Sequence, residues 1–340
     1  MQKCGMHRHR DIQKKGGSVE YVSHVYKMKN IEPFNKVWLD CYNNLKLSLL
    51  LSVDKTLEIH GYENLYEYYK GKEVSGGGVE FNYITVEQKV CQYEQFSKIE
   101  EKDFVNQKDF NECIIHQLSK PLGFVLIRVD LHDWLEGSVS WKKFHWDHYS
   151  LLVEYDSEKQ VVTAFDELQG QYVKFQVDIN TLYGHLSHNS RFSQLRLITL
   201  KDEFELPVVD LEKCKYNAKR LIENIDKVYN SEFWKMNDND FRARSHMEVN
   251  GVFLQRIEGR QDANQKLIEN ILDNQEYEDR HRLENIHEGF SLLSKKWQGI
   301  RMELFRVYFD DRNRLKLLNV LNESMREALL YERKLWEEFI

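Results

Sequence analysis

Two runs of residues decide the fold: His148-Tyr149-Ser150-Leu151-Leu152-Val153-Glu154-Tyr155 and Val161-Val162-Thr163-Ala164-Phe165-Asp166. Both are rich in the apolar, aromatic and β-branched residues that strands favour. The polar turn Asp156-Ser157-Glu158 between them predicts an antiparallel hairpin. Similar runs predict further strands at 124–129, 172–177 and 195–200. Sequentially adjacent strands that follow a helical stretch indicate an α+β fold.

The hairpin predicts that a histidine and a carboxylate face each other. If Tyr155 pairs with Lys159 across the turn, the same register places His148 opposite Asp166. Opposed residues have Cβ atoms about 4.5–5.5 Å apart, close enough for a carboxylate to hold an imidazole. A solvated His/Asp pair across two strands is the simpler interpretation, and His145 is an alternative base.

Cys41 supplies the candidate nucleophile. It lies at the start of a predicted amphipathic helix over 41–53, in the run Trp38-Leu39-Asp40-Cys41-Tyr42-Asn43-Asn44-Leu45. The amides and the positive dipole end of a first helical turn stabilise a thiolate, which is the reactive form of cysteine. Alone, Cys41 is more simply one small core residue. Combined with His148 and Asp166, it predicts a Cys-His-Asp triad in which His148 is the base and Asp166 orients it.

The whole chain divides into three predicted parts. Residues 1–30 form a basic N-terminal arm, 31–207 a catalytic domain and 208–340 a helical domain, with Pro207 at the change in character. Helical spacing of apolar residues recurs almost to the end of the chain, and Asp210 and Asn264 are predicted N-caps. Helices are also expected at 62–70 and, mixed with strand, at 85–99.

Composition narrows the class of protein. The 340 residues carry a net charge of −7, with +5 on residues 1–36 and −10 on 37–207, which gives no support to nucleic-acid binding. No apolar run reaches the ~20 residues of a membrane span, and the basic start lacks the apolar stretch of a secretory signal. Five scattered cysteines suit free thiols in a reducing compartment. We therefore expect a cytoplasmic protein, with an oligomer possible.

Histidine pairs, a glycine-rich run and an aromatic-rich stretch are further candidate sites. His145 and His148, like His185 and His188, are spaced as metal ligands can be, but no accompanying motif supports a metal site, so none is expected. The run 75–78 lacks the ending of a phosphate-binding loop. An aromatic-rich stretch around the start of the hairpin is a candidate substrate pocket, although core packing would explain it equally: Trp134, Trp141, Phe144, Trp146 and Tyr149.

Three features together resemble the N-terminal domain of the butirosin biosynthesis protein H family. They are the Asp40-Cys41 helix start, the block Pro121-Leu122-Gly123-Phe124-Val125-Leu126-Ile127-Arg128-Val129-Asp130, and the order His148-Tyr149, Tyr155-Asp156, Ala164-Phe165-Asp166. The resemblance covers about residues 30–200. It implies a papain-like domain, in which a helix carrying the cysteine packs on an antiparallel sheet. Because papain-like enzymes carry Gln six residues before the cysteine, Asn35 becomes an oxyanion candidate besides the Cys41 amide.

The resemblance also implies a function. Members of that family are cysteine acyltransferases of natural-product pathways. The implied activity moves an acyl or peptidyl group from the phosphopantetheine thioester of a carrier protein to an amine, with no bound cofactor. A basic patch is then expected to dock the acidic carrier, drawn from residues 1–36 or from Arg242, Arg244, Arg256 and Arg260. The alternatives are a cysteine peptidase or thioesterase of the same fold, or a catalytically silent scaffold in a biosynthetic complex.

Overall fold

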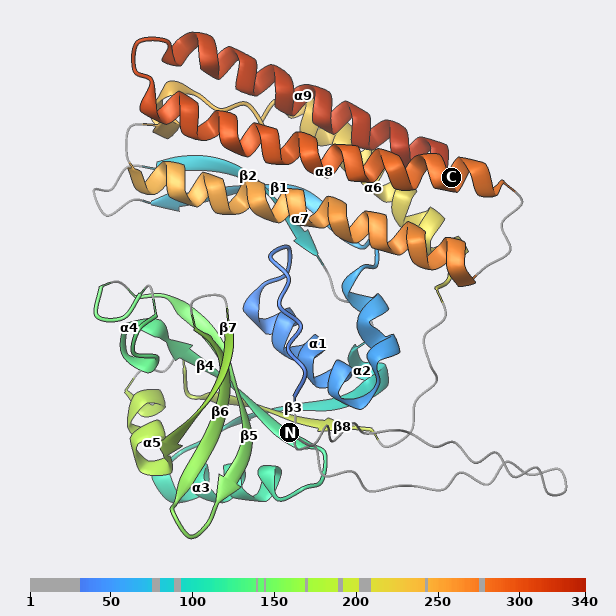
Figure 1. Ribbon diagram of the computed structural model, residues 1–340. Helices are drawn as coiled ribbons and strands as arrows, with labels where there is room; N and C mark the ends of the chain where they lie inside the picture. Colours follow the sequence, from blue (N-terminus) through green and yellow to red (C-terminus); the bar gives the residue numbers. More distant parts are fainter. Residues whose placement is uncertain are drawn as a thin grey trace, which may run out of the picture.

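The computed structural model shows an α+β protein with a sheet-containing part and a C-terminal helical part (Figure 1). The part of the chain that it describes comprises 31–74, 80–88, 93–138, 140–143, 145–168, 171–188, 192–201, 209–241, 244–274 and 279–340. The predicted basic arm over 1–30, the run 75–78 and Pro207 lie outside these ranges.

A six-stranded antiparallel sheet forms the lower part of the molecule in Figure 1. Its strand order is β3-β8-β4-β5-β6-β7. The strands are β3 (Ser97–Asp103), β4 (Gly123–Asp130), β5 (Asp147–Asp156), β6 (Val161–Leu168), β7 (Gln171–Asp178) and β8 (Gln194–Leu200). All five strands predicted from the sequence are confirmed. The stretch 85–99 contains the end of the strand β2, the short helix α2 (Tyr93–Phe96) and the start of β3, so its described residues are the predicted mixture of strand and helix, while 89–92 lie outside the described residues.

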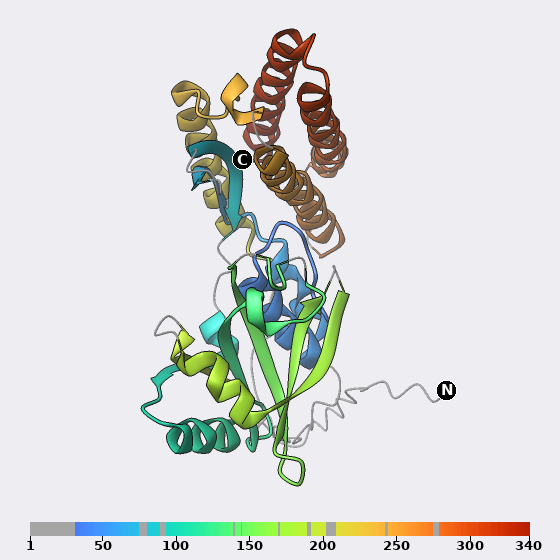
Figure 2. The same cartoon turned by 90° about the vertical axis from the view of Figure 1, so that its left-hand side faces the viewer.

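Each face of the sheet is covered by helices. Leu126 and Leu151 belong to the core under α1 (Cys41–Val53), whereas their neighbours Val125 and Leu152 pack with the helices on the opposite face. Those helices are α3 (Gln107–Leu118) and α5 (Ile179–Ser187), and Figure 2 shows them on the side away from α1. The alternation follows from the two-residue period of strands. The short helix α4 (Leu131–Trp134) follows β4.

Helix α1 begins at Cys41 and ends at Val53, as predicted, but it is not amphipathic in its packing. Every residue from Asn44 to Leu51 is buried. Figure 1 shows the reason: α1 lies between the sheet and the long C-terminal helices. The 3-10 helix η1 (Lys55–Gly61) follows it. Polar residues on α1 are therefore inside the protein, and they need internal partners.

The predicted helix over 62–70 is wrong. This stretch contains the strand β1 (Tyr66–Val74), which pairs with β2 (Glu80–Gln88) in a separate two-stranded sheet. Tyr66 and Tyr68 are 3% and 2% exposed because alternate residues of β1 face the C-terminal helices. Burial of this alternating tyrosine face outweighs local helix propensity.

The C-terminal part contains four long helices: α6 (Leu211–Ser231), α7 (Arg244–Asn274), α8 (Arg280–Phe309) and α9 (Arg314–Phe339). A 3-10 helix, η3 (Asp238–Phe241), lies between α6 and α7. Asp210 caps α6 as predicted, since its carboxylate accepts from the Lys213 amide. The prediction for Asn264 is wrong: it lies inside α7, fully buried, and donates to the Tyr66 hydroxyl at 2.8 Å.

Buried polar groups join the β1–β2 hairpin to these helices. The Glu332 carboxylate of α9 accepts from the Tyr66 hydroxyl at 2.5 Å, from Tyr68, and from Gln261 of α7 at 2.8 Å. Glu332 is completely buried, and burial raises its pKa although these hydrogen bonds oppose the shift. The hairpin, which comes from the N-terminal half of the sequence, is thus an integral part of the helical core.

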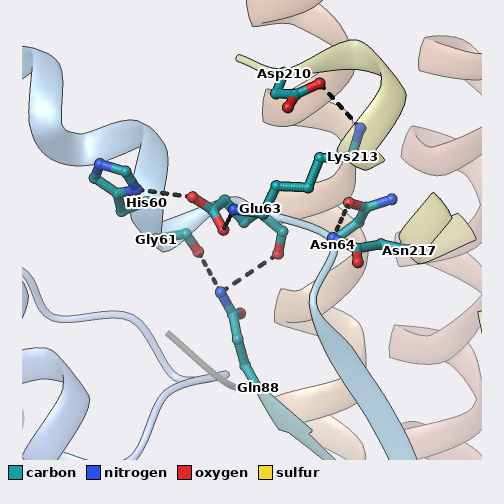
Figure 3. Close-up of polar contacts among 8 residues, drawn as sticks. All are labelled: His60, Gly61, Glu63, Asn64, Gln88, Asp210, Lys213 and Asn217. Atoms are coloured by element: carbon teal, nitrogen blue, oxygen red, sulfur yellow. Dashed lines mark hydrogen bonds and ion pairs between the residues drawn. The ribbon is translucent and has the colours of Figure 1, made fainter. Parts of the chain in front are cut away.

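A second polar cluster connects η1 with the hairpin and α6 (Figure 3). Glu63 contacts the His60 imidazole at 2.8 Å and the Lys213 ammonium at 3.3 Å. Gln88 donates to the Gly61 carbonyl at 3.1 Å. These contacts fix the end of the α1–η1 segment against the helical part of the molecule.

Candidate active site

Cys41 is the first residue of α1 and is partly exposed. Asp40 is the N-cap, and its carboxylate accepts from the Asn43 amide at 2.7 Å. The amides of a first helical turn have no partners within the helix, and together with the helix dipole they favour negative charge there. The sequence therefore places a sulfur where a thiolate is stabilised.

His148 lies at the start of β5, only 9% exposed, and its Nε2 is 2.6 Å from Asp166 Oδ1 on β6. The predicted His148–Asp166 contact is present, but the predicted register is wrong. Leu151 pairs with Phe165, two residues beyond the predicted partner, because the turn is longer and the ladder is irregular near Val153. A shift of two keeps both side chains on one face, as diagonal neighbours within reach of each other.

Cys41 lies close enough to the His148 ring to be one of the groups that raise the pKa of His148. Since Nε2 contacts Asp166, Nδ1 is the nitrogen left for the sulfur. Burial lowers the pKa of His148, but the hydrogen bonds and charges of Asp166 and Cys41 outweigh burial and raise this pKa to about 10. An imidazolium at neutral pH next to a sulfur favours a thiolate–imidazolium pair.

Asp166 is fully buried, and its two oxygens have different partners. Oδ1 faces His148 and also accepts from the Glu167 amide at 2.7 Å. Oδ2 accepts from the indole nitrogen of Trp134 at 3.0 Å. His148, Asp166 and Trp134 thus form one hydrogen-bonded chain, and Cys41 lies beside its His148 end.

The structure does not bring the aromatic pocket candidates to one place. Trp134 and Trp141 line a hollow over β7, together with Phe175 and His185, on the α5 side of the sheet. Trp146 is exposed, and Phe144 lies outside the described residues. Tyr149 faces α1.

Tyr149 belongs to an aromatic and cationic wall beside Cys41. Its ring lies 5.0 Å from that of Tyr42, the residue after Cys41. The Arg196 guanidinium lies over both rings, at 4.9 Å from Tyr42 and 5.3 Å from Tyr149. Arg196 also forms an ion pair with Glu101 at 3.0 Å. Of the pocket candidates, Tyr149 is the one placed on the side of the sheet that carries Cys41.

Asn35, the oxyanion candidate, is exposed and lies on the extended segment 32–36 before α1. The amides on either side of it are bound to α1: Phe34 donates to Ser48 Oγ at 2.8 Å and Lys36 to Asn44 Oδ1 at 3.1 Å. The segment that carries Asn35 is therefore fixed against the helix that begins at Cys41, and the role of Asn35 as an oxyanion donor stays a prediction.

His145, the alternative base, is joined to a different carboxylate. Its Nδ1 lies 2.6 Å from Asp130 Oδ2, its side chain is 75% exposed, and its ring stacks on His132 at 4.5 Å. His148 is the histidine whose pKa Cys41 raises.

Sequence reasoning missed Tyr172. This residue pairs with Glu167 across β6 and β7, and its ring stacks on Phe165 at 4.8 Å. Burial, and then the negative charges of Glu167, Asp166 and Cys41, raise its pKa well above the usual range. Its hydroxyl therefore keeps its proton close to the triad. The sequence could have indicated that Tyr172 lies near the triad, because it stands at the start of the strand that directly follows the strand with Asp166.

No group of three or more His, Cys, Asp or Glu side chains within the described ranges is arranged to hold a metal ion. No helix in the same ranges is both long and apolar enough to cross a bilayer. No family model matches the chain, and no curated protein is similar to it.

Proposed function

We propose that this chain is a papain-like, cysteine-dependent acyltransferase that moves an acyl or peptidyl group from a carrier-protein thioester to an amine in secondary metabolism. One observation carries the proposal: His148 is hydrogen-bonded to the buried Asp166, and Cys41 lies close enough to the same imidazole to raise its pKa. The packing of α1 on an antiparallel sheet and the sequence resemblance described above support it. We also propose that it acts in the cytoplasm, because its scattered cysteines suit free thiols in a reducing compartment.

In the first step, the Cys41 sulfur attacks the thioester carbonyl carbon, and the carbonyl electron pair moves to oxygen. When the tetrahedral intermediate collapses, the bond to the carrier sulfur breaks and that sulfur takes a proton from His148. The acyl group is then bound to Cys41. Asp166 stabilises the charged imidazole and fixes its orientation.

In the second step, an amine attacks the acyl-enzyme and passes a proton to His148. The bond to the Cys41 sulfur breaks, the amide leaves, and the thiolate–imidazolium pair is restored. The developing oxyanion needs donors. The Cys41 amide at the helix start and Asn35 are the candidates for this role.

Docking of the carrier needs cations near the site, because carrier proteins are acidic. Arg260 is excluded as a docking residue: it is completely buried and donates to the Tyr62 carbonyl at 2.7 Å. Arg244 is exposed and paired with Glu248, while Arg256 lies over Phe253 at 5.3 Å. Residues 1–36 remain candidates only in part, since 1–30 lie outside the described residues, as does Arg242.

The test is intact-protein mass spectrometry after mixing the protein with carriers charged with different acyl groups. We expect a mass gain equal to the acyl group, absent in Cys41→Ala and present in Cys214→Ala, whose thiol is buried. A gain that persists in Cys41→Ala would refute the proposed nucleophile.

Two alternatives are separate outcomes of the same experiment. Release of free acid at equal rates with and without amines would show a thioesterase or peptidase, in which water takes the place of the amine. Absence of any acyl-enzyme, together with a Cys41 that reacts with iodoacetamide no faster than a free thiol, would favour a scaffold.

A further inference from the structure

We propose that Trp134 is a positioning residue of the triad: its indole N–H holds the buried Asp166 carboxylate in the orientation that presents Oδ1 to His148. Its importance for turnover rests on the proposed function. The positioning itself can be tested without a substrate.

The argument begins with the Asp166 carboxylate, which is fully buried. A buried carboxylate needs a donor at each oxygen. Oδ1 has His148 at 2.6 Å and the Glu167 amide at 2.7 Å, whereas for Oδ2 the donor is Trp134 at 3.0 Å. Without the indole N–H, the carboxylate could satisfy Oδ2 only by rotating towards other donors, and this would take Oδ1 away from the imidazole.

The donor is itself fixed in place. Trp134 ends α4, whose first turn is capped by the Asp130 carboxylate accepting from the His132 amide at 3.0 Å. The indole is 7% exposed and packs edge-on against Phe175 at 5.6 Å and His185 at 6.1 Å. A donor held by packing on two sides positions its acceptor without reorganisation, as outer partners of active-site groups do.

The consequence reaches the imidazole. Burial lowers the pKa of His148, and the hydrogen bond to Asp166 is the first of the effects that raise it. Loss of the indole N–H loosens this contact and therefore has to lower the pKa of His148. A neutral imidazole offers Cys41 no positive charge, so the pH at which Cys41 alkylation changes has to move with the His148 pKa.

The experiment compares three full-length variants. Trp134→Phe removes the donor, and Trp134→3-benzothienylalanine removes it while keeping the shape of the indole. Trp234→Phe is the matched control, because it removes a buried indole N–H in the helical part of the molecule, where Trp234 donates to the Tyr229 carbonyl at 3.3 Å. Alkylation of Cys41 by iodoacetamide is followed by peptide mass spectrometry between pH 7 and pH 10, and the His148 pKa by NMR of labelled histidine. Cys214 reports nonspecific opening, since burial raises its pKa to about 12.

For both Trp134 variants we expect the His148 pKa to fall by about one unit from its value of about 10, which is a tenfold weaker hold on the proton. The change in the Cys41 alkylation rate that accompanies loss of this proton should therefore occur about one pH unit lower than in the wild type. Trp234→Phe should match the wild type. With a charged carrier, kcat should fall by a similar factor while KM changes less than twofold.

Equal alkylation rates and equal His148 pKa values in Trp134→3-benzothienylalanine and wild type would overturn the inference. Increased labelling of Cys214 in a variant would show that the fold of this variant had loosened. The benzothienyl variant keeps the shape of the indole, so we expect its packing to be preserved. If alkylation and pKa shift as expected but no acyl-enzyme forms in any protein, the proposed function fails and the positioning role of Trp134 remains.

Discussion

His148 depends on its two neighbours for its charge. Buried at the start of β5, it would lose its proton below the ordinary histidine pKa if it were alone. Asp166 and Cys41 reverse this tendency and raise the pKa to about 10. Variants of Asp166 and of His148 itself test how far these contacts outweigh the burial of the imidazole.

Asp166→Asn keeps the shape of the side chain but removes its charge. We expect the pKa of His148 to fall from about 10 and kcat with a charged carrier to fall roughly 10³–10⁴-fold, as when the acid of such a triad is neutralised. The pH profile of Cys41 alkylation measures the first effect and single-turnover acylation the second. Asp156→Asn in the hairpin turn is the control. An unchanged alkylation profile would contradict the assigned role of Asp166.

The raised pKa also predicts how stability depends on pH. The folded protein holds the His148 proton up to pH of about 10, whereas the unfolded chain releases it near 6.5. Folded molecules therefore bind more protons in this window. The stabilisation is complete below the lower value and is lost as pH rises to the upper one, at up to about 1.4 kcal/mol per unit.

Urea unfolding of wild type and His148→Gln between pH 6 and 10 measures this effect. The difference in unfolding free energy between the two proteins should shrink as pH rises. His116→Gln, at an exposed position of α3, is the control. A constant difference for His148→Gln would show that the histidine is not charged in the folded protein.

At the scale of elements, the spacing of hydrogen-bond donors along the segment 32–36 matches the spacing of the acceptors along α1. Amides of Glu32, Phe34 and Lys36 donate to Ser52, Ser48 and Asn44, at 3.0, 2.8 and 3.1 Å. Four residues of extended chain span about 13 Å, and eight residues of helix span about 12 Å. Pro33, which has no amide hydrogen, occupies one of the positions between these donors. This match fixes the chain that leads into Cys41.

Asn44→Ala removes the end of this contact nearest to Cys41. Asn44 is 4% exposed, and it also donates to the carbonyls of Lys36 at 3.1 Å and Leu39 at 3.4 Å. We expect a loss of about 1–3 kcal/mol of unfolding free energy and slower alkylation of Cys41, because the helix start loosens. Urea denaturation and alkylation at pH 7 measure the two. Asn43→Ala, on the adjacent partly exposed position, should change stability by less than about 0.5 kcal/mol, and equal effects of the two variants would refute the role of Asn44.

At the scale of the whole molecule, the two parts of the chain share their cores. The β1–β2 hairpin packs with the C-terminal helices, and Gly259 of α7 lies against the residues that precede α1. A Cβ at Gly259 would be 2.6 Å from Val37 Cγ2 and 3.0 Å from Trp38 Cε3, so only glycine fits there. The helical part therefore supports the helix that carries Cys41.

Glu332→Ala tests this shared core. It leaves the hydroxyls of Tyr66 and Tyr68 and the Gln261 amide without their buried acceptor. We expect a loss of roughly 3–5 kcal/mol, seen as a lower urea midpoint both in far-UV circular dichroism and in Cys41 protection. Glu327→Ala, an exposed position on the same helix, should change stability by less than about 1 kcal/mol. A urea midpoint that falls in circular dichroism but not in Cys41 protection would show that the two parts of the chain unfold separately.

Much of this arrangement could be predicted from local patterns. Runs of apolar, aromatic and β-branched residues predicted β4 to β8, and an Asp-Cys pair before a long apolar stretch predicted the start of α1. The contact between His148 and Asp166 survived an error in register because a shift of two residues preserves the face of a strand. Local patterns failed at 62–70 and at Asn264, where partners more than a hundred residues away replace local preferences.

The sequence by itself determined the strands, the helix start at Cys41 and the histidine and aspartate that share a face, since these depend on periodicity and on neighbours a few residues apart. Only the tertiary structure decided that His148, and not His145, is the histidine beside the Cys41 thiol. It also decided that Trp134 donates its indole N–H to Asp166, and that a hairpin from the N-terminal half of the sequence completes the helical core. These contacts join residues distant along the chain, and no local preference encodes which distant group satisfies a buried donor or acceptor.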